Sequence, residues 1–151
     1  MPVLSGRTIL TRFIITSLLN PQTQRQPCSI DLSLKTLSSF TSRGTLDFSN
    51  ALRKTASTSP LAHEQSEDKG KDKGRYWDLS AGAYLMEFNE VVDVPLDCVG
   101  FLYPRSSLWR SGAVVGSGVV DAGYKGAVGG CLQVRLSSPS LPGYVCVCQF
   151  G

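Results

Sequence analysis

The chain has 151 residues, the length of one domain with a single core, and this excludes a second full catalytic domain. Hydrophobic residues make up 42% and charged residues 18%, a balance that excludes a disordered chain and a coiled coil, while 15 Gly and 8 Pro favour short strands joined by turns. The net charge of +3 is too small for a surface that coats nucleic acid, but it is compatible with a local pocket for a polyphosphate.

The N-terminal segment predicts a short amphipathic helix that begins after Ser5, a suitable N-cap residue, and ends at Asn20-Pro21. Its apolar residues follow near-helical spacing: Ile9, Leu10, Phe13, Ile14 and Leu18. The segment also has arginines and no acidic residue, as organellar transit peptides do, so a mitochondrial location is the alternative to the preferred cytoplasmic or nuclear one. No run approaches the ~18 apolar residues of a membrane span, and we expect no contact with a membrane.

The next segments differ sharply in composition. Residues 28–34, CSIDLSL, alternate apolar and polar side chains and predict a strand with one solvent-exposed face. Residues 53–76 turn to Ser and Thr and then to a run of charges of both signs with no large apolar side chain. Such a run favours a mobile surface insertion over a nucleic-acid patch, and we expect no nucleic-acid partner.

From Trp77 onward the sequence is rich in strand-forming segments. The expected strands are 83–88, 91–94, 98–103, 113–120, 131–136 and 144–150. Turn signals separate most of them, at Asn89-Glu90, Pro95 to Asp97, Ala122-Gly123 and Gly129-Gly130. Short strands at this spacing predict an antiparallel barrel or jelly roll.

The cysteines and the single histidine point away from a zinc site, a His-rich metal cluster and a His-based catalytic relay. The five cysteines lack the CxxC spacing of a zinc site and are interpreted as reduced, mostly buried thiols. A soft-metal pair at Cys146 and Cys148, on the same side of a strand, is the alternative. His63 lies in a polar stretch and is expected to be a solvated loop residue.

Residues 103–126 concentrate polar groups between apolar strands. Arg105 and the two hydroxyls that follow it can donate charge-assisted hydrogen bonds to a phosphate chain. Asp121 precedes a Gly-containing turn and can hold and deprotonate a water molecule. An ordinary Arg-Ser-Ser turn and an ordinary hairpin connection are the structural alternatives.

Three motifs in order resemble the trimeric dUTPase and dCTP deaminase superfamily: CSIDLSL at 28–34, PRSSL at 104–108 and GVVDAGYKG at 118–126. The resemblance extends over nearly the whole chain, and it is strongest to dUTPase-like members with a dCTP-deaminase-type N-terminus, because LSGRTI at 4–9 is similar to their opening helix. It implies a single mainly β domain over 1–151, a distorted jelly roll or β-clip barrel with a short N-terminal helix. It also implies a homotrimer whose active sites lie at subunit interfaces.

The resemblance assigns the phosphate end of the site to the first two motifs. Arg105, Ser106 and Ser107 would bind the triphosphate, with the Ser106 hydroxyl near the oxygen that bridges the α- and β-phosphorus atoms. Asp31 would help to place a hydrated Mg²⁺. Arg110 matches a deaminase-type RSSLxR pattern and is taken as substrate-binding, with bracing of the trimer interface as its alternative role.

The third motif is assigned to the nucleoside. Asp121 would orient the attacking water and accept from the sugar 3′-hydroxyl, and the Tyr124 ring would leave no space for a 2′-hydroxyl. Gly118 and Gly126 would let main-chain groups reach the uracil edge.

The function that this resemblance implies is Mg²⁺-dependent hydrolysis of dUTP to dUMP and diphosphate. A dCTP deaminase or a bifunctional relative is the first alternative, but the deaminases carry a glutamate ten residues after the third-motif aspartate, and here that position is Cys131. A non-catalytic nucleotide-binding paralogue is the second alternative, because residues 137–151 do not resemble the family's usual C-terminal continuation and an altered closing strand would impair activity.

Overall fold

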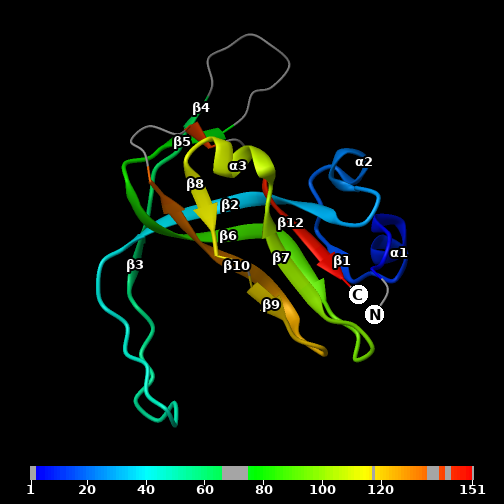
Figure 1. The fold of residues 1–151 in the computed structure, drawn as a ribbon, viewed down its shortest axis with the longest axis horizontal. Coiled ribbons are helices and arrows are strands. Elements are labelled where there is room, and N and C mark those ends of the chain that lie inside the picture. Colours follow the sequence, from blue (N-terminus) through cyan, green and yellow to red (C-terminus); the bar gives the residue numbers. More distant parts are fainter. Residues whose placement is uncertain (1–2, 66–74, 117, 136–139, 142–143, 151) are drawn as a thin grey trace.

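The computed structural model describes residues 3–65, 75–116, 118–135, 140–141 and 144–150. Its elements in chain order are α1 (Gly6–Thr11), β1 (Ile15–Thr16), α2 (Pro21–Gln24), β2 (Ile30–Phe40), β3 (Thr58–Pro60), β4 (Glu64–Gln65), β5 (Arg75–Asp78), β6 (Gly82–Asp93), β7 (Gly100–Pro104), α3 (Ser106–Arg110), β8 (Ala113–Val115), β9 (Gly118–Val120), β10 (Lys125–Val134), β11 (Ser140–Leu141) and β12 (Tyr144–Phe150). The fold is mainly β, as the sequence predicts (Figure 1).

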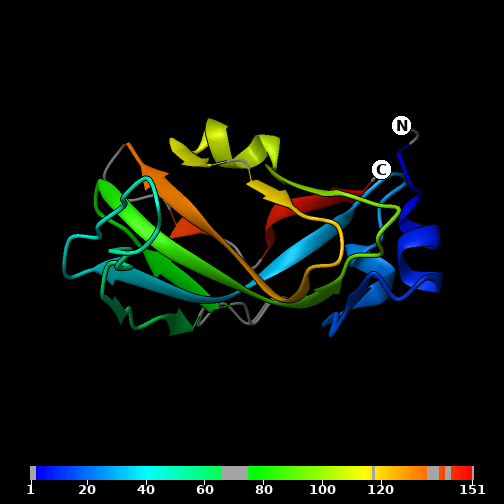
Figure 2. The ribbon, with the colours of Figure 1, turned by 90° about the horizontal axis from the view of Figure 1, so that it is seen from below.

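One large antiparallel sheet dominates the structure, with the strand order β8-β10-β6-β2-β12-β7-β9. The edge strands β8 and β9 are consecutive in the sequence and are linked only by residues 116 and 117. Because so short a link cannot cross a flat sheet of this width, the sheet must curl until its two edges approach each other. Figure 2 shows this curvature, with β12 and β9 layered over β6 and β10. The barrel-like fold expected from the sequence is confirmed.

The core lies inside the curled sheet. Its largest fully buried side chains come from β2, β6, β7, β10 and β12 and from the N-terminal segment: Phe88, Phe150, Ile9, Ile14, Ile15, Ile30, Leu32, Leu34, Leu37, Met86, Leu102 and Leu132. Strand β12 lies between β2 and β7, so the C-terminal segment completes the sheet at 144–150 rather than leaving an open edge there. The remainder of the atypical segment 137–151 lies largely outside the described residues, as do the side chains of Cys146 and Cys148.

The N-terminal segment differs from the prediction in length. The Ser5 side chain accepts a hydrogen bond from the Thr8 amide and caps α1, as expected. The helix ends at Thr11, however, because Phe13 adopts a positive φ of 55° and the chain then enters β1, which pairs with β6. Pro21 also does not end a helix: it is the first residue of α2, whose N-cap is Asn20.

Three sequence-based expectations about the strands are wrong. The expected turn at Asn89-Glu90 lies inside the continuous strand β6. The expected break at Gly129-Gly130 lies inside β10, where a bulge between Ala127 and Gly129 absorbs the irregularity. The exposed face expected for residues 28–34 is also incorrect, because Asp31 and Ser33 are buried.

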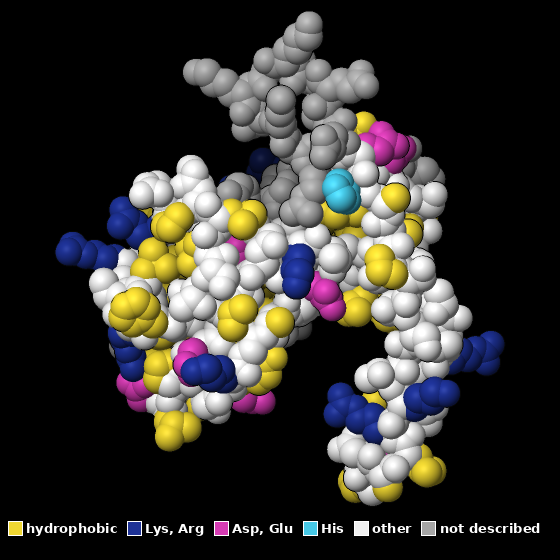
Figure 3. Space-filling view, turned by 180° about the vertical axis from the view of Figure 1, so that it is seen from behind, with side chains coloured by type: hydrophobic (Ala, Val, Ile, Leu, Met, Phe, Trp, Pro, Cys, Tyr) yellow, Lys and Arg dark blue, Asp and Glu magenta, His cyan; other side chains and the backbone are white. Residues whose placement is uncertain are grey.

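The segment after β2 leaves the body of the protein. Residues 41–57 form a two-stranded arm, held by hydrogen bonds in both directions between Thr45 and Lys54, that projects from the sheet (Figures 1 and 3). The insertion expected at 53–76 therefore begins within this arm. It continues into β3, which pairs with β2, and then into β4. Residues 66–74 of this segment lie outside the described part. No helix in the described ranges is long and apolar enough to cross a membrane.

Candidate functional site

A cavity of about 290 Å³ lies beside the turn that joins β9 to β10. Three residues that the sequence analysis assigned to the nucleoside line it: Gly118, Asp121 and Tyr124. The cavity wall is completed by Leu102, Val119, Val120, Ala127, Val128 and Gly129. It thus combines a mostly apolar wall with a single carboxylate and a phenol, and this is the usual composition of a small-molecule site.

Backbone contacts fix the shape of this turn. The Gly123 amide donates to the Val94 carbonyl at 2.8 Å, and the Val94 amide donates to the Tyr124 carbonyl at 2.9 Å, so the turn is anchored to the end of β6. The Lys125 ammonium reinforces the anchor through a 2.6 Å ion pair with Asp93. Asp121 is exposed at the start of the turn, where a bound ligand can reach its carboxylate.

Tyr124 folds back over the same hairpin. Its hydroxyl donates to the Ala127 carbonyl at 2.7 Å, and 43% of the residue is exposed. Gly126 has a φ of +154°, and a Cβ there would lie 3.0 Å from the Tyr124 hydroxyl oxygen, so a larger residue would displace the ring. A Cβ at Gly118 would meet nothing within 4 Å, which means that the backbone of β9 faces open space at the cavity.

The PRSSL segment leads from β7 into the helix α3: Pro104 is the last residue of β7, Arg105 is the N-cap, and the helix begins at Ser106, so the alternative of an ordinary turn does not hold. Ser106 and Ser107 are exposed in its first turn, and Arg110 is exposed in its last turn. Leu108 is buried and packs the helix onto the sheet. The two hydroxyls therefore belong to exposed residues that directly follow Arg105 in the sequence, and neither lines the cavity of the β9–β10 turn.

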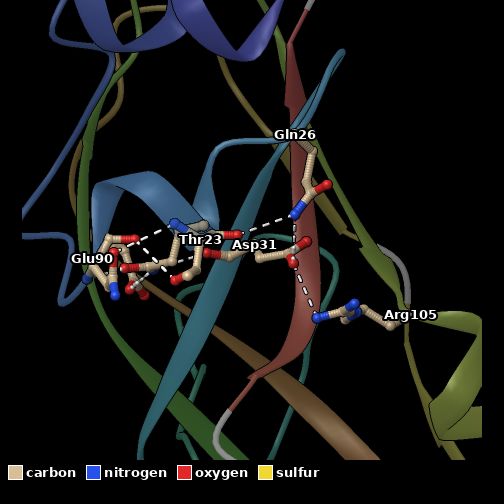
Figure 4. Close-up of polar contacts among 7 residues, drawn as sticks. Thr23, Gln26, Asp31, Glu90 and Arg105 are labelled. Carbon is tan, nitrogen blue, oxygen red and sulfur yellow. Dashed lines mark hydrogen bonds and ion pairs between the residues drawn. The ribbon is translucent and has the colours of Figure 1, made fainter.

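Arg105 forms an ion pair with the first-motif aspartate. Its Nη1 lies 2.9 Å from Asp31 Oδ2, and the Gln26 amide nitrogen donates to the same oxygen at 3.1 Å (Figure 4). The Asp31 side chain is 5% exposed and that of Arg105 is 41% exposed, so the guanidinium is held from the buried side and keeps an accessible side. Burial raises the pKa of Asp31 above its ordinary value, and Arg105 and the Gln26 hydrogen bond oppose this shift.

A second buried carboxylate lies close to this pair, and the sequence analysis missed it. Glu90 is fully buried on β6 and contacts Ser33 and Gln24. One sequence signal was available: in the alternating pattern of β6, Glu90 falls in phase with Met86, Phe88 and Val92, which form the buried face. The interpretation of Asn89-Glu90 as a turn hid this signal.

The structure does not bring Arg105 and Asp121 together within one chain. Arg105 follows β7 and Asp121 follows β9, and the two strands are antiparallel with Gly100 opposite Val120 and Leu102 opposite Gly118. By this register Asp121 lies opposite residue 99, six residues before Arg105. At about 3.3 Å per residue, the backbones of Asp121 and Arg105 are about 20 Å apart along the strands. The two groups cannot contact one phosphate of the same ligand within a single chain.

The expected contact between Asp31 and a hydrated Mg²⁺ does not fit this arrangement. The Asp31 carboxylate is buried and is already bound to a guanidinium and an amide through Oδ2, and a second cation beside Arg105 would be repelled. The described residues contain no group of three or more His, Cys, Asp and Glu side chains that could hold a metal ion. A magnesium ion at this site would have to take its ligands chiefly from substrate phosphates and water.

Comparisons with known proteins identify the family. The profile of the dCTP deaminase-like family matches residues 3–141. The chain belongs to the dCTP deaminase-like family. A crystal structure of 2′-deoxycytidine 5′-triphosphate deaminase from Agrobacterium tumefaciens has the same fold, with a TM-score of 0.65 and 19% sequence identity, over 98% of this chain and 47% of that one.

Archaeal relatives are closer in sequence. A probable deoxyuridine 5′-triphosphate nucleotidohydrolase from Methanosarcina mazei is 35% identical over 113 residues, which cover 75% of this chain and 61% of the relative. A deoxyuridine 5′-triphosphate nucleotidohydrolase from Methanocaldococcus jannaschii is 33% identical over 111 residues, which cover 74% of this chain and 67% of the relative. This dCTP deaminase-like chain therefore spans less than two thirds of the length of the Methanosarcina mazei relative.

Proposed function

We propose that the protein hydrolyses dUTP to dUMP and diphosphate at a site shared between two copies of the chain. The observation that carries the proposal is the separation of the two halves of the site within one chain. The cavity at the β9–β10 turn offers Asp121 to a nucleotide, and the accessible guanidinium of Arg105 lies about 20 Å away along the β7–β9 ladder. The names of the archaeal relatives support dUTP as the substrate.

In the proposed arrangement the cavity of one copy holds the nucleoside. The Tyr124 ring lies against the sugar, where its position, fixed by the 2.7 Å hydrogen bond to Ala127, leaves no room for a ribose 2′-hydroxyl. Gly118 allows main-chain groups to contact the base edge, since it lines the cavity and a Cβ there would meet nothing within 4 Å. Gly126 does not line the cavity, and its missing side chain instead leaves room for the Tyr124 ring. Asp121 orients the water that attacks the α-phosphorus and accepts its proton.

The second copy supplies the phosphate-binding groups. Arg105 and the exposed hydroxyls of Ser106 and Ser107 neutralise and position the triphosphate. Arg110, exposed in the last turn of the same helix, is the further candidate for a phosphate contact. Asp31 is assigned here to holding Arg105 rather than to binding metal. A dependence on Mg²⁺ remains a prediction from the family resemblance, with the ion bound by the substrate phosphates.

Deamination is disfavoured by the residue at position 131. Cys131 is exposed on β10, paired with Leu85 of β6, and the sequence has no acidic residue after Asp121. A thiol does not supply the two proton transfers that deamination of a cytosine ring requires.

The test is to incubate the purified protein with dUTP or dCTP in the presence of Mg²⁺ and to identify the products by mass. Formation of dUMP and diphosphate from dUTP supports the proposal. Formation of dUTP or dUMP from dCTP would instead establish deaminase activity, and the absence of any product would favour a non-catalytic nucleotide-binding protein.

A further inference from the structure

The fully buried side chain of Glu90 is the feature from which a further role can be inferred. It is 0% exposed on the core-facing side of β6, where its neighbours in phase are Met86, Phe88 and Val92. A carboxylate in such a position costs free energy unless hydrogen bonds compensate for the lost hydration. The carboxylate of Glu90 therefore needs donors from the surrounding residues.

Donors from β2 and α2 meet this need. Glu90 Oε2 accepts from the Ser33 amide at 2.9 Å, and Oε1 accepts from the Ser33 hydroxyl at 2.6 Å. Oε1 also accepts from the Gln24 side-chain amide at 2.6 Å, and the same nitrogen donates to the Asp31 carbonyl at 2.9 Å. Glu90 thus contacts Ser33 directly and Asp31 through Gln24. Figure 4 shows Glu90 and Asp31 within this network of polar contacts.

These contacts replace a missing part of the sheet. The register between β2 and β6 runs from Leu34 opposite Phe88 toward the far end of β2. Further along β6, past Phe88, the strand pairs with β1 at Val91 and Val92. The Ser33 amide therefore donates to a side-chain carboxylate of β6 instead of a backbone carbonyl, just where Asp31 must be held.

The network also reaches the Asp31 side chain from α2. Gln24 is the last residue of α2, and its side-chain oxygen accepts from the Asn20 amide at 2.8 Å, so the network fixes this short helix at both ends. Two residues further on, the Gln26 amide nitrogen donates to the Thr23 carbonyl and to Asp31 Oδ2. The backbone and the carboxylate of Asp31 are therefore both tied to the structure that Glu90 anchors.

We propose that Glu90 is a positioning residue: through Ser33 and Gln24 it holds the Asp31 segment of β2 so that the Asp31 carboxylate orients Arg105 for a phosphate ligand. This inference rests on the proposed function for the role of Arg105. Glu90 acts on the ligand only through Asp31 and Arg105.

The variant Glu90→Gln tests the proposal with a change of almost no volume. The substitution replaces one acceptor oxygen with an NH2 group, which can only donate. This group must then face another donor, either at Ser33 or at Gln24, and one hydrogen bond is lost. The matched control is Glu87→Gln on the same strand, because Glu87 is exposed and accepts a 2.8 Å hydrogen bond from Thr36 at the surface.

The first readout is a double-mutant cycle on dUTP hydrolysis. We expect Glu90→Gln to lower kcat/KM by about 10- to 100-fold, which is the usual cost of a misplaced binding group, and Glu87→Gln to leave it unchanged. In the Asp31→Asn background the further loss from Glu90→Gln should shrink to about twofold or less, since both changes act through the same carboxylate. Fully additive losses would overturn the proposal, because they would show that Glu90 acts independently of Asp31.

The second readout does not depend on catalysis. The NMR signal of the Arg105 side-chain Nε–H reports whether the guanidinium is held by Asp31. We expect this signal in Glu90→Gln to move toward its position in Asp31→Asn and to stay in place in Glu87→Gln; an unchanged signal in Glu90→Gln would contradict the proposal. If the wild-type protein does not hydrolyse dUTP, the proposed function fails and this signal still tests the positioning role.

Should Glu90→Gln fail to fold, Gln24→Met replaces it. This variant removes the link from Glu90 to the Asp31 carbonyl and leaves both contacts between Glu90 and Ser33 in place. The Arg105 signal is expected to move in the same direction as in Asp31→Asn, and an unmoved signal would again count against the proposal.

Discussion

The Asp31–Arg105 ion pair leads to a prediction in which stability and activity respond differently. Asp31→Asn removes the buried charge but keeps a side-chain oxygen that can accept from Gln26 and Arg105. Removing one partner of a buried ion pair is usually costly because the other charge stays buried and unpaired. Here the Arg105 side chain is 41% exposed and water can solvate it.

We therefore expect Asp31→Asn to change the free energy of unfolding at pH 7 by less than about 1 kcal/mol, as for an exposed pair. The same variant should lower kcat/KM for dUTP by about 10- to 100-fold, because Arg105 loses the partner that orients it.

The pH dependence has a definite sign. Burial raises the pKa of Asp31 above its ordinary value of 3.8, so the folded protein binds this proton more tightly than the unfolded chain does. The contribution of Asp31 to stability is therefore largest below pH 3.8 and is lost as the pH rises through the folded-state pKa. Relative to Asp31→Asn, the wild-type protein should become less stable as the pH rises through this range.

Urea unfolding of both proteins between pH 3 and pH 7, with dUTP hydrolysis measured at pH 7, checks both parts. A loss of about 3 kcal/mol or more at pH 7 would show that Arg105 is left as an uncompensated buried charge. Unchanged hydrolysis would show that Asp31 does not orient Arg105, and either result would refute the reasoning.

Three further predictions concern the cavity and the metal. Asp121→Asn should reduce dUTP hydrolysis by about 100-fold or more while dUTP binding, measured by calorimetry, is retained; undiminished turnover would show that another group is the base. Gly126→Ala should destabilise the protein by about 1–3 kcal/mol in urea unfolding, because φ is +154° and the new Cβ would lie 3.0 Å from the Tyr124 hydroxyl oxygen, and an unaltered midpoint would argue against this strain. Chelation with EDTA should abolish hydrolysis and added Mg²⁺ should restore it, whereas full activity in EDTA would exclude a required divalent ion.

Much of the fold, and part of the cavity lining, could be predicted from the strand pattern and the motif residues of the sequence. The alternation at 28–34 and the apolar, strand-forming segments after Trp77 placed β2, β7 and β12 near their observed positions, and the two strands expected at 83–88 and 91–94 both lie within β6. The GVVDAGYKG turn was located correctly, and Gly118, Asp121 and Tyr124 line one cavity. These features depend on local sequence, which explains why they could be predicted.

The polar interior could not be predicted in the same way. Asp31 and Ser33 alternate with apolar residues and therefore looked like a solvent-exposed face. Their burial depends on polar partners outside their own strand, among them Arg105 and Glu90, which are more than 50 residues away in the sequence. Pro21 suggested the end of a helix, and only the Asn20 cap shows that it begins one. Tertiary hydrogen bonds decide the burial of Asp31 and Ser33, whereas the start of α2 at Pro21 depends on the local hydrogen bonds of the Asn20 cap.

The shared site is tested most directly by subunit complementation. Arg105→Gln and Asp121→Asn are each expected to be inactive alone, and the two are co-expressed in equal amounts with the same affinity tag, so that homogeneous and mixed assemblies are purified together. If each site takes Arg105 from one chain and Asp121 from another, one half times one half, or about one quarter, of the sites in an equal mixture are intact. Recovery of about a quarter of the wild-type dUTP hydrolysis is the predicted result, and mixed assemblies as inactive as their parents would contradict a site built from two copies.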